Sequence, residues 1–300
     1  MKVCVTGGSG NIGRYVVERI KRKHDVTILD LKPSTAHPDI ARLAIDLMDS
    51  AQAKRSLAGF DAVVHLAAVP NPFDYPPESC IKVNVPTTWA VLEAAVTNRI
   101  RRVIYGGSDS ATGFGIHLAK HKPLYVPIDE QHPCWPHEAY GLSKYFGELV
   151  CQEYSRAFRI ETISLRYQWV WLDICREAME RIAAMEEDDI GDDPWFGSYI
   201  FPEDVAQGVD LALDYEFRDA VFPFEAFYLA AADTFVKMDT LELLTRIYPD
   251  GPPPGKRKGY FRKNLRACVF DLTKARNELA FNPEFTWRDI HSARRMRFPS

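Results

Sequence analysis

The stretch KVCVTGGSGNIGRYVVERIKRKHDVTILD, residues 2–30, decides the fold of this chain. It contains a short apolar run, a glycine-rich turn at 6–13, a stretch with apolar residues at helical spacing from 12 to about 23, and a second apolar run that ends on Asp30. This order predicts a strand, a tight turn, an amphipathic helix and a second strand with an acid at its end. Such a βαβ unit is the layout of a dinucleotide-binding site.

The glycines of the turn each have a physical task. Gly7 permits a tight turn with positive φ, Gly10 lets backbone N–H groups approach a pyrophosphate, and Gly13 lets the helix pack closely against the strand. Asn11 and Ile12 lie where the helix begins. Because the unpaired N–H groups and the positive dipole end of a helix N-terminus favour a diphosphate, we expect this turn to hold one.

Asp30 is expected to accept hydrogen bonds from the hydroxyls of an adenosine ribose. A 2′-phosphate at that position would meet a like charge, so the sequence predicts NAD rather than NADP as the cofactor. A tight turn followed by an exposed acid is the alternative, and the completeness of the βαβ context argues against it. The glycines are spaced GxxGxxG and not GxGxxG.

Composition excludes several classes of protein. The chain has 300 residues, of which 46% are hydrophobic and 26% charged, and these are ordinary values for a soluble globular protein. Its formal charge of −4 gives no electrostatic reason to expect nucleic acid or an anionic membrane as a partner. No apolar run approaches the roughly 20 residues that span a bilayer, and the first residues read as a strand rather than a signal peptide. The six cysteines are scattered without metal-ligand spacing, so we expect reduced thiols, no metal and a cytoplasmic location.

Segments typical of strands and helices alternate through the first half and predict an α/β fold, a Rossmann-type doubly wound parallel sheet. Further strands are expected at 41–45, 61–66, 102–105, 161–165, 227–231 and near 269, and further helices at 50–57, 78–98 with a kink or break at Pro86, 137–158, 174–193, 202–213 and near 273 and 287. We expect residues 1–166 to form the NAD-binding domain, with 203–232 returning to it, and residues 167–300 to form a smaller C-terminal substrate-binding lobe.

A second motif, Tyr140-Gly141-Leu142-Ser143-Lys144, places a tyrosine and a lysine four residues apart on a predicted helix. Residues at this spacing share one helical face. A neighbouring ammonium favours the phenolate and is expected to lower the pKa of Tyr140 from about 10, and an oxidised nicotinamide would add to the effect. Tyr140 can then act as a general base toward a substrate hydroxyl while a hydride leaves the same carbon. The alternative is an ordinary surface pair.

The third catalytic group is expected to be a hydroxyl at the end of the strand before that helix. Ser108 follows the apolar strand 103–105 at the right distance, and it would hydrogen-bond the reacting oxygen and position it for Tyr140. Ser110 competes with it, because counting back from Gly115 favours Ser110 while counting from the strand favours Ser108. We prefer Ser108, since strand ends fix geometry better than loops do.

Taken together, these motifs resemble the extended short-chain dehydrogenase/reductases, the NAD-dependent epimerase/dehydratase family that includes UDP-galactose 4-epimerase and uronate dehydrogenase. The resemblance spans nearly the whole chain. The segments that carry it are TGGSGNIG (Thr6–Gly13), Asp30, Asp46-Leu47, His65-Leu66-Ala67-Ala68, Asn84-Val85 with Thr87, Ser108, YGLSK (Tyr140–Lys144), Leu165-Arg166-Tyr167 and the closing pattern from Asp271 to Phe285.

The resemblance implies further cofactor contacts. Asp46 and Leu47 would flank the adenine ring. Ala67, with Leu66 and Ala68 beside it, would line the diphosphate and ribose side of the cofactor.

It also implies roles nearer the reaction. Asn84 would help to order the active site, and Lys144 would bind the hydroxyls of the nicotinamide ribose. Proteins of this family are commonly homodimers joined by a four-helix interface, here the helices of 78–98 and 138–158, although the apolar residues of these helices could equally be core. We interpret His65 as a packed strand histidine rather than a catalytic one.

Departures from the family pattern bear on the reaction. Ser108 is followed by Asp109-Ser110 without a glutamate, which disfavours dehydration. Residues 168–172 read QWVWL where the family continues with an asparagine and a Pro/Gly-rich turn under the nicotinamide, and this predicts a bulkier, more apolar pocket or an unusual substrate.

The basic run 256–266 would capture a phosphate or form a solvated loop. Tryptophans 169, 171 and 195 would wall a sugar ring or pack as core.

The sequence therefore predicts an NAD-dependent oxidoreductase that removes a hydride from a secondary alcohol of a sugar, sugar acid or nucleotide sugar, as a dehydrogenase or an epimerase. The alternative is a non-catalytic NAD-binding sensor or scaffold of the same fold. The trio of Ser108, Tyr140 and Lys144 argues against it, since a sensor has no need of these three side chains.

Overall fold

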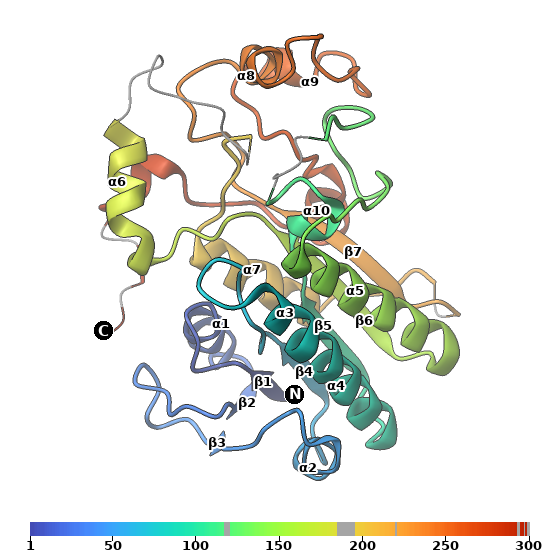
Figure 1. Cartoon of the computed structure of the whole chain (residues 1–300). Coiled ribbons are helices and arrows are strands. Elements are labelled where there is room, and N and C mark those ends of the chain that lie inside the picture. The colour runs from blue at the N-terminus through green and yellow to red at the C-terminus, as the bar shows by residue number, and fades with distance from the viewer. Residues whose placement is uncertain (117–120, 185–195, 220, 293–294, 297, 299–300) are drawn as a thin grey trace.

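A computed structural model describes residues 1–116, 121–184, 196–219, 221–292, 295, 296 and 298. Within these residues the centre of the molecule is a parallel sheet of seven strands in the order β3-β2-β1-β4-β5-β6-β7 (Figure 1). The strands are β1 (Lys2–Thr6), β2 (Asp25–Leu29), β3 (Arg42–Leu43), β4 (Ala62–His65), β5 (Arg102–Gly106), β6 (Glu161–Tyr167) and β7 (Phe224–Leu229). The predicted fold class, a Rossmann-type parallel sheet, is confirmed.

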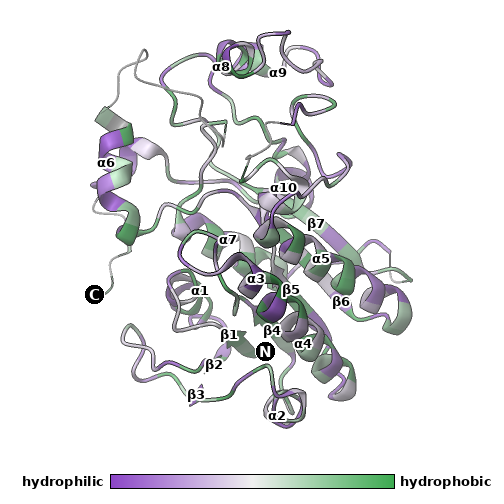
Figure 2. Cartoon of the chain, viewed as in Figure 1, coloured by the Kyte–Doolittle hydropathy of each residue, from purple (hydrophilic) through white to green (hydrophobic). Residues whose placement is uncertain are grey.

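Helices cover both faces of the sheet, and this explains why the central strands are apolar on both sides. On one face, α1 (Gly13–Ile20) and α7 (Pro202–Leu213) pack against each other over one hydrophobic core. On the other face, α2 (Ser50–Ser56), α4 (Val85–Thr97) and α5 (Ala139–Phe158) cover a second core. In Figure 2, α4 and α5 each carry hydrophobic and hydrophilic residues, as expected of helices with one buried face.

Gly147 of α5 leaves room for the phenol of Tyr105, a buried residue of β5. A Cβ atom on this glycine would lie 2.2 Å from the phenol oxygen of Tyr105, so a larger residue would collide with that side chain. The α5 helix carries both residues of the Tyr-Lys motif near its N-terminus. Gly147 therefore makes room for a buried β5 side chain against the helix that carries the motif.

The helix predicted over 78–98 is interrupted. It consists of α3 (Pro77–Ser79), a π-helical turn (Cys80–Asn84) and α4. Pro86 is the second residue of α4, directly after the π-helical turn, and it cannot donate the backbone hydrogen bond that a helical residue makes to the preceding turn. The irregularity therefore comes just before the proline, in the π-helical turn, which often marks a functional site.

The C-terminal part lies beyond the carboxyl ends of the strands, with α8 and α9 farthest from the sheet (Figure 1). Its helices are α6 (Arg176–Ala184), α8 (Thr240–Ile247), α9 (Tyr260–Lys263) and α10 (Thr273–Glu278), and short 3₁₀ turns span Asp109–Thr112, Asp173–Cys175 and Trp287–Asp289. The strand predicted near Val269 was wrong, because Phe270 makes only an isolated bridge with Ile128. Residues 185–193 of the predicted acidic helix lie outside the described residues. The domain boundary at residue 166 stays a prediction.

Three general properties bear on the class of protein. None of the helices in the described residues combines the length and the apolar character needed to cross a membrane. All six cysteines are free. The described part of the chain contains no group of three His, Cys, Asp or Glu side chains that could hold a metal ion. The cytoplasmic location stays a prediction from cysteine usage.

Candidate active site

The glycine turn lies where the strand order reverses, between β1 and β4, which is where ligands bind in sheets of this kind. Gly7 has a φ of +68°, and a Cβ atom on it would lie 2.7 Å from the backbone nitrogen of Ala67. A Cβ atom on Gly13 would lie 2.2 Å from the carbonyl oxygen of Gly7. The turn therefore packs against both α1 and the end of β4 through bare backbone, and a side chain at Gly7 or Gly13 would collide with that backbone.

Next to this turn is a cavity of about 230 Å³ with mainly apolar walls. It is lined by Gly7, Leu29, Asp30, Leu31, Ile45, Asp46, Leu47, Ala67, Ala68, Val69, Pro70, Tyr75, Val83 and Thr87. Six of these residues were expected from the sequence to contact the cofactor, namely Gly7, Asp30, Asp46, Leu47, Ala67 and Ala68. The remaining apolar residues, such as Ile45 and Val83, were missed. Because it lies beside the turn where the cofactor's diphosphate is expected, this cavity is where we expect the adenosine, and we call it the adenosine pocket.

The carboxylate of Asp30 lies at this cavity with its two oxygens already oriented. One oxygen accepts the backbone N–H of Ser9 at 3.1 Å, and the other accepts that of Lys32 at 3.0 Å. The side chain is half-buried, so it also has room to accept hydrogen bonds from a ligand. This geometry suits the ribose contact that the sequence predicts.

The other residues expected at the cofactor lie nearby. Gly10 and Asn11 are exposed in the turn, and Ile12 is the residue that precedes α1. Leu66 follows β4, and its backbone N–H donates to the carbonyl of Thr6 at 3.1 Å. These positions surround the N-terminus of α1, where a diphosphate is expected.

Asn84 ties together two segments that border the site. Its side-chain oxygen accepts the backbone N–H of Val69 at 2.7 Å, and its side-chain nitrogen donates to the hydroxyl of Ser143 at 3.0 Å. Val69 lies at the adenosine pocket, and Ser143 lies on α5 beside Lys144. The buried amide thus connects the cofactor side of the site with the helix of the Tyr-Lys motif, as its expected ordering role requires.

The predicted catalytic residues meet at the carboxyl end of β5. The phenol of Tyr140 lies near enough to the hydroxyl of Ser108 for the serine to lower the pKa of the phenol. The ammonium of Lys144 donates to the carbonyl of Gly106 at 2.8 Å and lies 5.7 Å from the centre of the Tyr140 ring. Ser110 donates its backbone N–H to the Ser108 oxygen at 3.1 Å. The structure thus brings Ser108, Tyr140 and Lys144 together, with Ser110 supporting Ser108.

Two features of α5 hold Tyr140 in place. Glu138 precedes the helix, and its carboxylate accepts the backbone N–H groups of Tyr140 and Gly141. A Cβ atom on Gly141 would lie 2.5 Å from the carbonyl oxygen of Ser110, so the start of α5 packs directly on the loop after β5. The capped helix end and the catalytic loop therefore form one rigid unit.

The electrostatics of the phenol differ from the expectation. Burial raises the pKa of Tyr140, the neighbouring Tyr167 adds to the increase, and the hydrogen bond with Ser108 opposes it. Burial also lowers the pKa of Lys144 to about 8. Within the protein's own residues desolvation therefore shifts the phenol pKa upward, opposite to the expected lowering, and the lowering expected with oxidised NAD bound stays a prediction.

His65 is a packed strand histidine. Its ring nitrogens lie 2.8 Å from the hydroxyl oxygen of Thr6 and 3.2 Å from that of Thr88. Burial lowers its pKa to about 3, so the ring is neutral. These contacts satisfy both nitrogens within the core, in agreement with the interpretation from the sequence.

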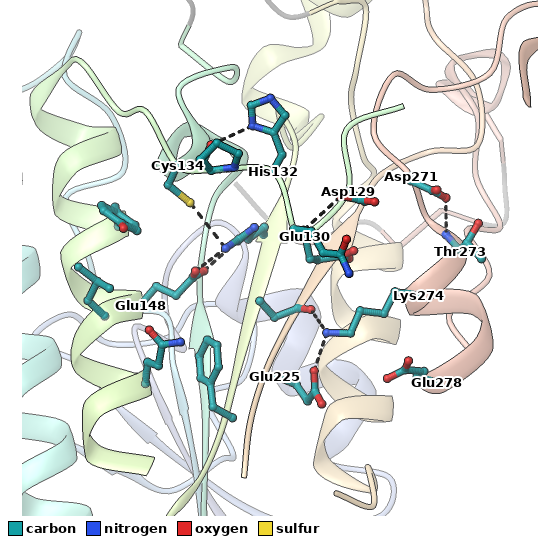
Figure 3. Close-up of a pocket in the computed structure, with 18 of the residues that line it drawn as sticks. Asp129, Glu130, His132, Cys134, Glu148, Glu225, Asp271, Thr273, Lys274 and Glu278 are labelled. Atoms are coloured by element: carbon teal, nitrogen blue, oxygen red, sulfur yellow. Dashed lines mark hydrogen bonds and ion pairs between the residues drawn. The ribbon is translucent and has the colours of Figure 1, made fainter. Parts of the chain in front are cut away.

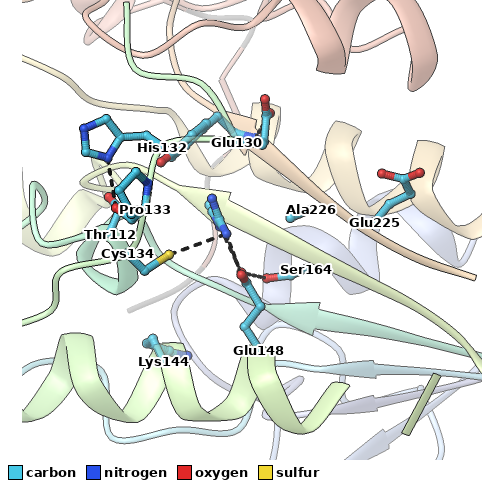
Figure 4. A network of polar contacts seen from close by, with 12 residues as sticks. Thr112, Glu130, His132, Pro133, Cys134, Lys144, Glu148, Ser164, Glu225 and Ala226 are labelled. Carbon is cyan, nitrogen blue, oxygen red and sulfur yellow. Dashed lines mark hydrogen bonds and ion pairs between the residues drawn. The ribbon is translucent and has the colours of Figure 1, made fainter. Parts of the chain in front are cut away.

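A second polar network fixes α5 from its other side. Glu148 of α5 accepts hydrogen bonds from Ser164 at 2.7 Å and from the Arg166 guanidinium at 2.9 Å, and Arg166 also points toward the sulfur of Cys134 (Figure 4). Glu148, Arg166 and Cys134 line a polar cavity of about 680 Å³ between α5 and α10 (Figure 3). On the far wall, Lys274 is paired with Glu225. The buried Glu148–Arg166 pair therefore locks the catalytic helix onto β6.

The basic run and the tryptophans have structural contacts. Lys256 is paired with Asp129, and Arg257 lies 3.0 Å from the carboxylate of Asp271. Trp171 is fully buried in the hydrophobic core of the C-terminal part, and Trp169 packs on it with ring centres 5.7 Å apart. Trp171 is therefore a core residue. Trp195 lies outside the described residues, and phosphate capture by the basic run stays a prediction.

Gln168 is a residue whose setting the sequence did not reveal. It follows β6, it is 3% exposed, and its side-chain amide makes no hydrogen bond within the described residues. A buried amide of this kind has free donor and acceptor capacity. The sequence signalled only that QWVWL departs from the family pattern.

The fold and the site together define a Rossmann-type dinucleotide-binding protein with a Ser-Tyr-Lys set at the carboxyl edge of its sheet. A model of the NAD dependent epimerase/dehydratase family matches residues 3–171. The chain belongs to this family, and the resemblance seen in the sequence is confirmed. NAD is the cofactor that membership assigns to the chain, and the glycine turn, Asp30 and the adenosine pocket fit it.

Curated relatives include sugar dehydrogenases and epimerases. The chain is 31% identical over 185 residues to L-arabinose 1-dehydrogenase (NAD(P)(+)) of Haloferax volcanii, covering 60% of this chain and 71% of that protein. It is 33% identical over 178 residues to a putative UDP-glucose 4-epimerase of Methanocaldococcus jannaschii, covering 56% of each chain. It is 30% identical over 168 residues to uronate dehydrogenase of Pseudomonas putida, covering 55% of this chain and 59% of that protein. The chain thus spans less than two thirds of the second and third of these relatives.

Solved structures share the fold over almost the full chain. The UDP-glucose 4-epimerase of Thermotoga maritima, solved with UDP-glucose, has a TM-score of 0.69 at 23% identity and covers 95% of this chain and 94% of its own. A short-chain dehydrogenase/reductase superfamily protein from Agrobacterium tumefaciens with bound NAD has a TM-score of 0.69 at 21% identity and covers 97% and 94%. At these identities the likeness shows the fold alone.

Proposed function

We propose that this protein is an NAD-dependent oxidoreductase that removes a hydride from a secondary alcohol of a sugar, sugar acid or nucleotide sugar. The observation that carries the proposal is the meeting of Ser108, Tyr140 and Lys144 at the carboxyl edge of the sheet that holds the adenosine pocket. The curated relatives, which are named as sugar dehydrogenases and nucleotide-sugar epimerases, support a sugar as the substrate.

Each residue has a distinct role in this proposal. Bound NAD supplies the hydride acceptor, and the turn at Gly7 and the carboxylate of Asp30 hold its diphosphate and adenosine ribose. Ser108 holds the substrate oxygen, and Tyr140 takes the proton from that oxygen. Lys144 keeps its ammonium near the phenol and binds the hydroxyls of the nicotinamide ribose. The enzyme acts as a dehydrogenase if NADH leaves, and as an epimerase if the hydride returns to the opposite face of the sugar.

Incubation of the purified protein with NAD and a panel of aldoses, uronates and nucleotide sugars tests the proposal. Net growth of NADH absorbance identifies a dehydrogenase, and isomer formation without it identifies an epimerase. Tyr140→Phe should lower kcat by about 10²–10⁴-fold, the usual contribution of a general base. Tyr145→Phe on the same helix is the matched control. Turnover retained by Y140F would reject the assigned base, and NAD binding without turnover of any alcohol would favour the sensor alternative.

We also propose that a second copy of this chain covers an apolar surface on α4 and α5. The side chains of Trp89, Leu149, Val150, Tyr154 and Phe158 surround a shallow cavity of about 400 Å³, and Trp89 and Phe158 are 53% and 54% exposed. A two-fold contact would bury this surface against itself. Sedimentation equilibrium should report a dimer that Trp89→Glu converts to a monomer. A monomeric wild-type protein would refute the proposal.

A further inference from the structure

A buried amide without a hydrogen-bond partner lies at the carboxyl edge of the sheet. Gln168 directly follows β6 and is 3% exposed. Neither Oε1 nor Nε2 of its side chain makes a hydrogen bond within the described residues. An unpaired buried donor or acceptor lowers stability, and native proteins contain few of them. The fold alone therefore gives no reason for a polar residue at this position.

The course of β6 places this amide on the face of the sheet that α5 covers. The backbone N–H of Gln168 donates to the carbonyl of Leu229 at 3.2 Å, so the pairing with β7 continues up to this residue. Ser164 and Arg166 both donate to Glu148 of α5. Because successive strand residues point to opposite faces, Gln168 lies on the same face as these two, nearer the carboxyl edge.

This position is level with the Tyr-Lys motif of α5. The helix runs antiparallel to the strands, and Tyr140–Lys144 precedes Glu148 by one to two helical turns. A helical turn rises about 5.4 Å and two strand residues span about 6.6 Å. Since Glu148 contacts Arg166, Gln168 is level with the turn that carries the motif. The neighbouring strand is β5, which Ser108 follows. The amide therefore borders the space where the substrate is expected.

The chemistry of the amide indicates which group it suits. The cations near it are already engaged, since Arg166 is paired with Glu148 and Lys144 donates to the carbonyl of Gly106. A carboxylate or phosphate in this buried place would need a counter-charge of its own. An amide is neutral and offers both donors and an acceptor, and a hydroxyl group does the same. Gln168 therefore suits a neutral hydroxyl.

We propose that Gln168 recognises a hydroxyl group of the substrate beside the reacting alcohol. Its Nε2 donates to the oxygen of that hydroxyl, and its Oε1 accepts the hydroxyl proton or that of a neighbouring hydroxyl. The inference rests on the proposed function and narrows its substrate class to a sugar with a free hydroxyl next to the reacting carbon. A deoxy sugar leaves the buried amide unpaired, so the site rejects it. Gln168 contacts the substrate and takes no part in the proton or hydride transfer.

The first test measures the stability of the free protein. Gln168→Met keeps the length of the side chain and removes both polar atoms, so its Tm should rise by about 2–6 °C. Gln207→Met is the matched control, because this similarly buried amide donates to Glu284 at 2.9 Å and accepts the backbone N–H of Asn282 at 3.0 Å. Its Tm should fall.

Gln168→Leu repeats the stability measurement if Q168M does not fold. If both variants are less stable than the wild type, the inference is overturned, since the amide then serves the fold, for example through a buried water molecule.

The second test uses the alcohol that the wild type turns over fastest in the panel, together with its monodeoxy analogues. The wild type should reject one analogue by at least about 10²-fold in kcat/KM. Q168M should discriminate by less than about tenfold, because it loses activity toward the parent sugar and keeps that toward the analogue. Q207M should discriminate as the wild type does.

The outcomes separate this inference from the proposed function. If the wild type accepts every analogue, or if Q168M keeps the full discrimination, the role of Gln168 is refuted, and the loss of turnover in Tyr140→Phe still supports the proposed function. A wild-type protein that turns over no alcohol would overturn both.

Discussion

Two buried carboxylates near the catalytic helix have opposite electrostatic surroundings. Glu148 is 6% exposed and lies against the guanidinium of Arg166, which outweighs the effect of burial and lowers the pKa of Glu148. Asp109 is 5% exposed and has the Ser108 hydroxyl as its side-chain partner, so burial raises its pKa to about 7. One group is a permanent anion, and the other can gain or lose a proton near neutral pH.

This difference separates a structural carboxylate from a functional one. A buried charge with a fitted counter-ion fixes elements in place, and it is costly only when the pair is broken. A buried carboxyl group that lacks such a partner lowers stability in its ionised form, and groups of this kind concentrate at functional sites. Glu148 therefore holds α5, whereas Asp109, beside Ser108, is the one of the two that can change its charge near neutral pH.

Breaking the Glu148–Arg166 pair should have the largest effect on stability. Glu148→Gln leaves the Arg166 guanidinium buried without its anion, so we expect a loss of about 3–5 kcal/mol in the free energy of unfolding. Urea unfolding at pH 7 measures it. The control is Glu153→Gln on the same helix, whose partner Arg156 is at the surface, and it should cost less than about 1 kcal/mol. Equal losses in the two variants would contradict a special role for the buried pair.

Asp109→Asn should have the opposite sign. The carboxyl pKa is 3.8 in the unfolded chain and about 7 in the folded one, so the folded state holds an extra proton between these values and the wild type loses stability as the pH rises through them. At pH 8 the variant should therefore be more stable, by at most about 4 kcal/mol, and at pH 4 the two proteins should be nearly equal. Urea unfolding at both pH values measures this difference. A variant less stable at pH 8 would show that the comparison with Glu148 is wrong.

Features that depend on local spacing could be predicted from the sequence, and features that depend on burial by distant segments could not. The glycine turn, Asp30 and the Tyr140–Lys144 pair follow from local spacing along one turn or one helix face, and the structure places them at one edge of the sheet. The Glu148–Arg166 pair and the setting of Asp109 depend on burial by elements distant in the chain. No spacing rule reports such burial, which also raises the pKa of Tyr140.

The C-terminal part illustrates the same limit. The apolar run near Val269 has the composition of a strand, but in the described residues it makes isolated bridges, Phe270 with Ile128 and Ala267 with Asp233, and stays irregular. The helix over 202–213 was predicted with its correct bounds, because Pro202 and the acidic first turn mark its start locally. Elements with local start signals were therefore predictable, and elements that depend on a neighbouring segment were not.

A third carboxylate, Asp30, extends the comparison to a partly exposed group and should give the smallest effect. Asp30→Asn keeps the shape of the side chain but removes the charge that strengthens its hydrogen bonds to a ribose. We expect the Kd for NAD to rise about tenfold, which is about 1.4 kcal/mol, and the affinity for NADP relative to NAD to increase because the repulsion of a 2′-phosphate is lost. Isothermal titration calorimetry measures both, with Asp25→Asn at the opposite end of β2 as the control. If the wild-type protein binds NADP as tightly as NAD, Asp30 does not contact the adenosine ribose, since a carboxylate there would repel the 2′-phosphate of NADP.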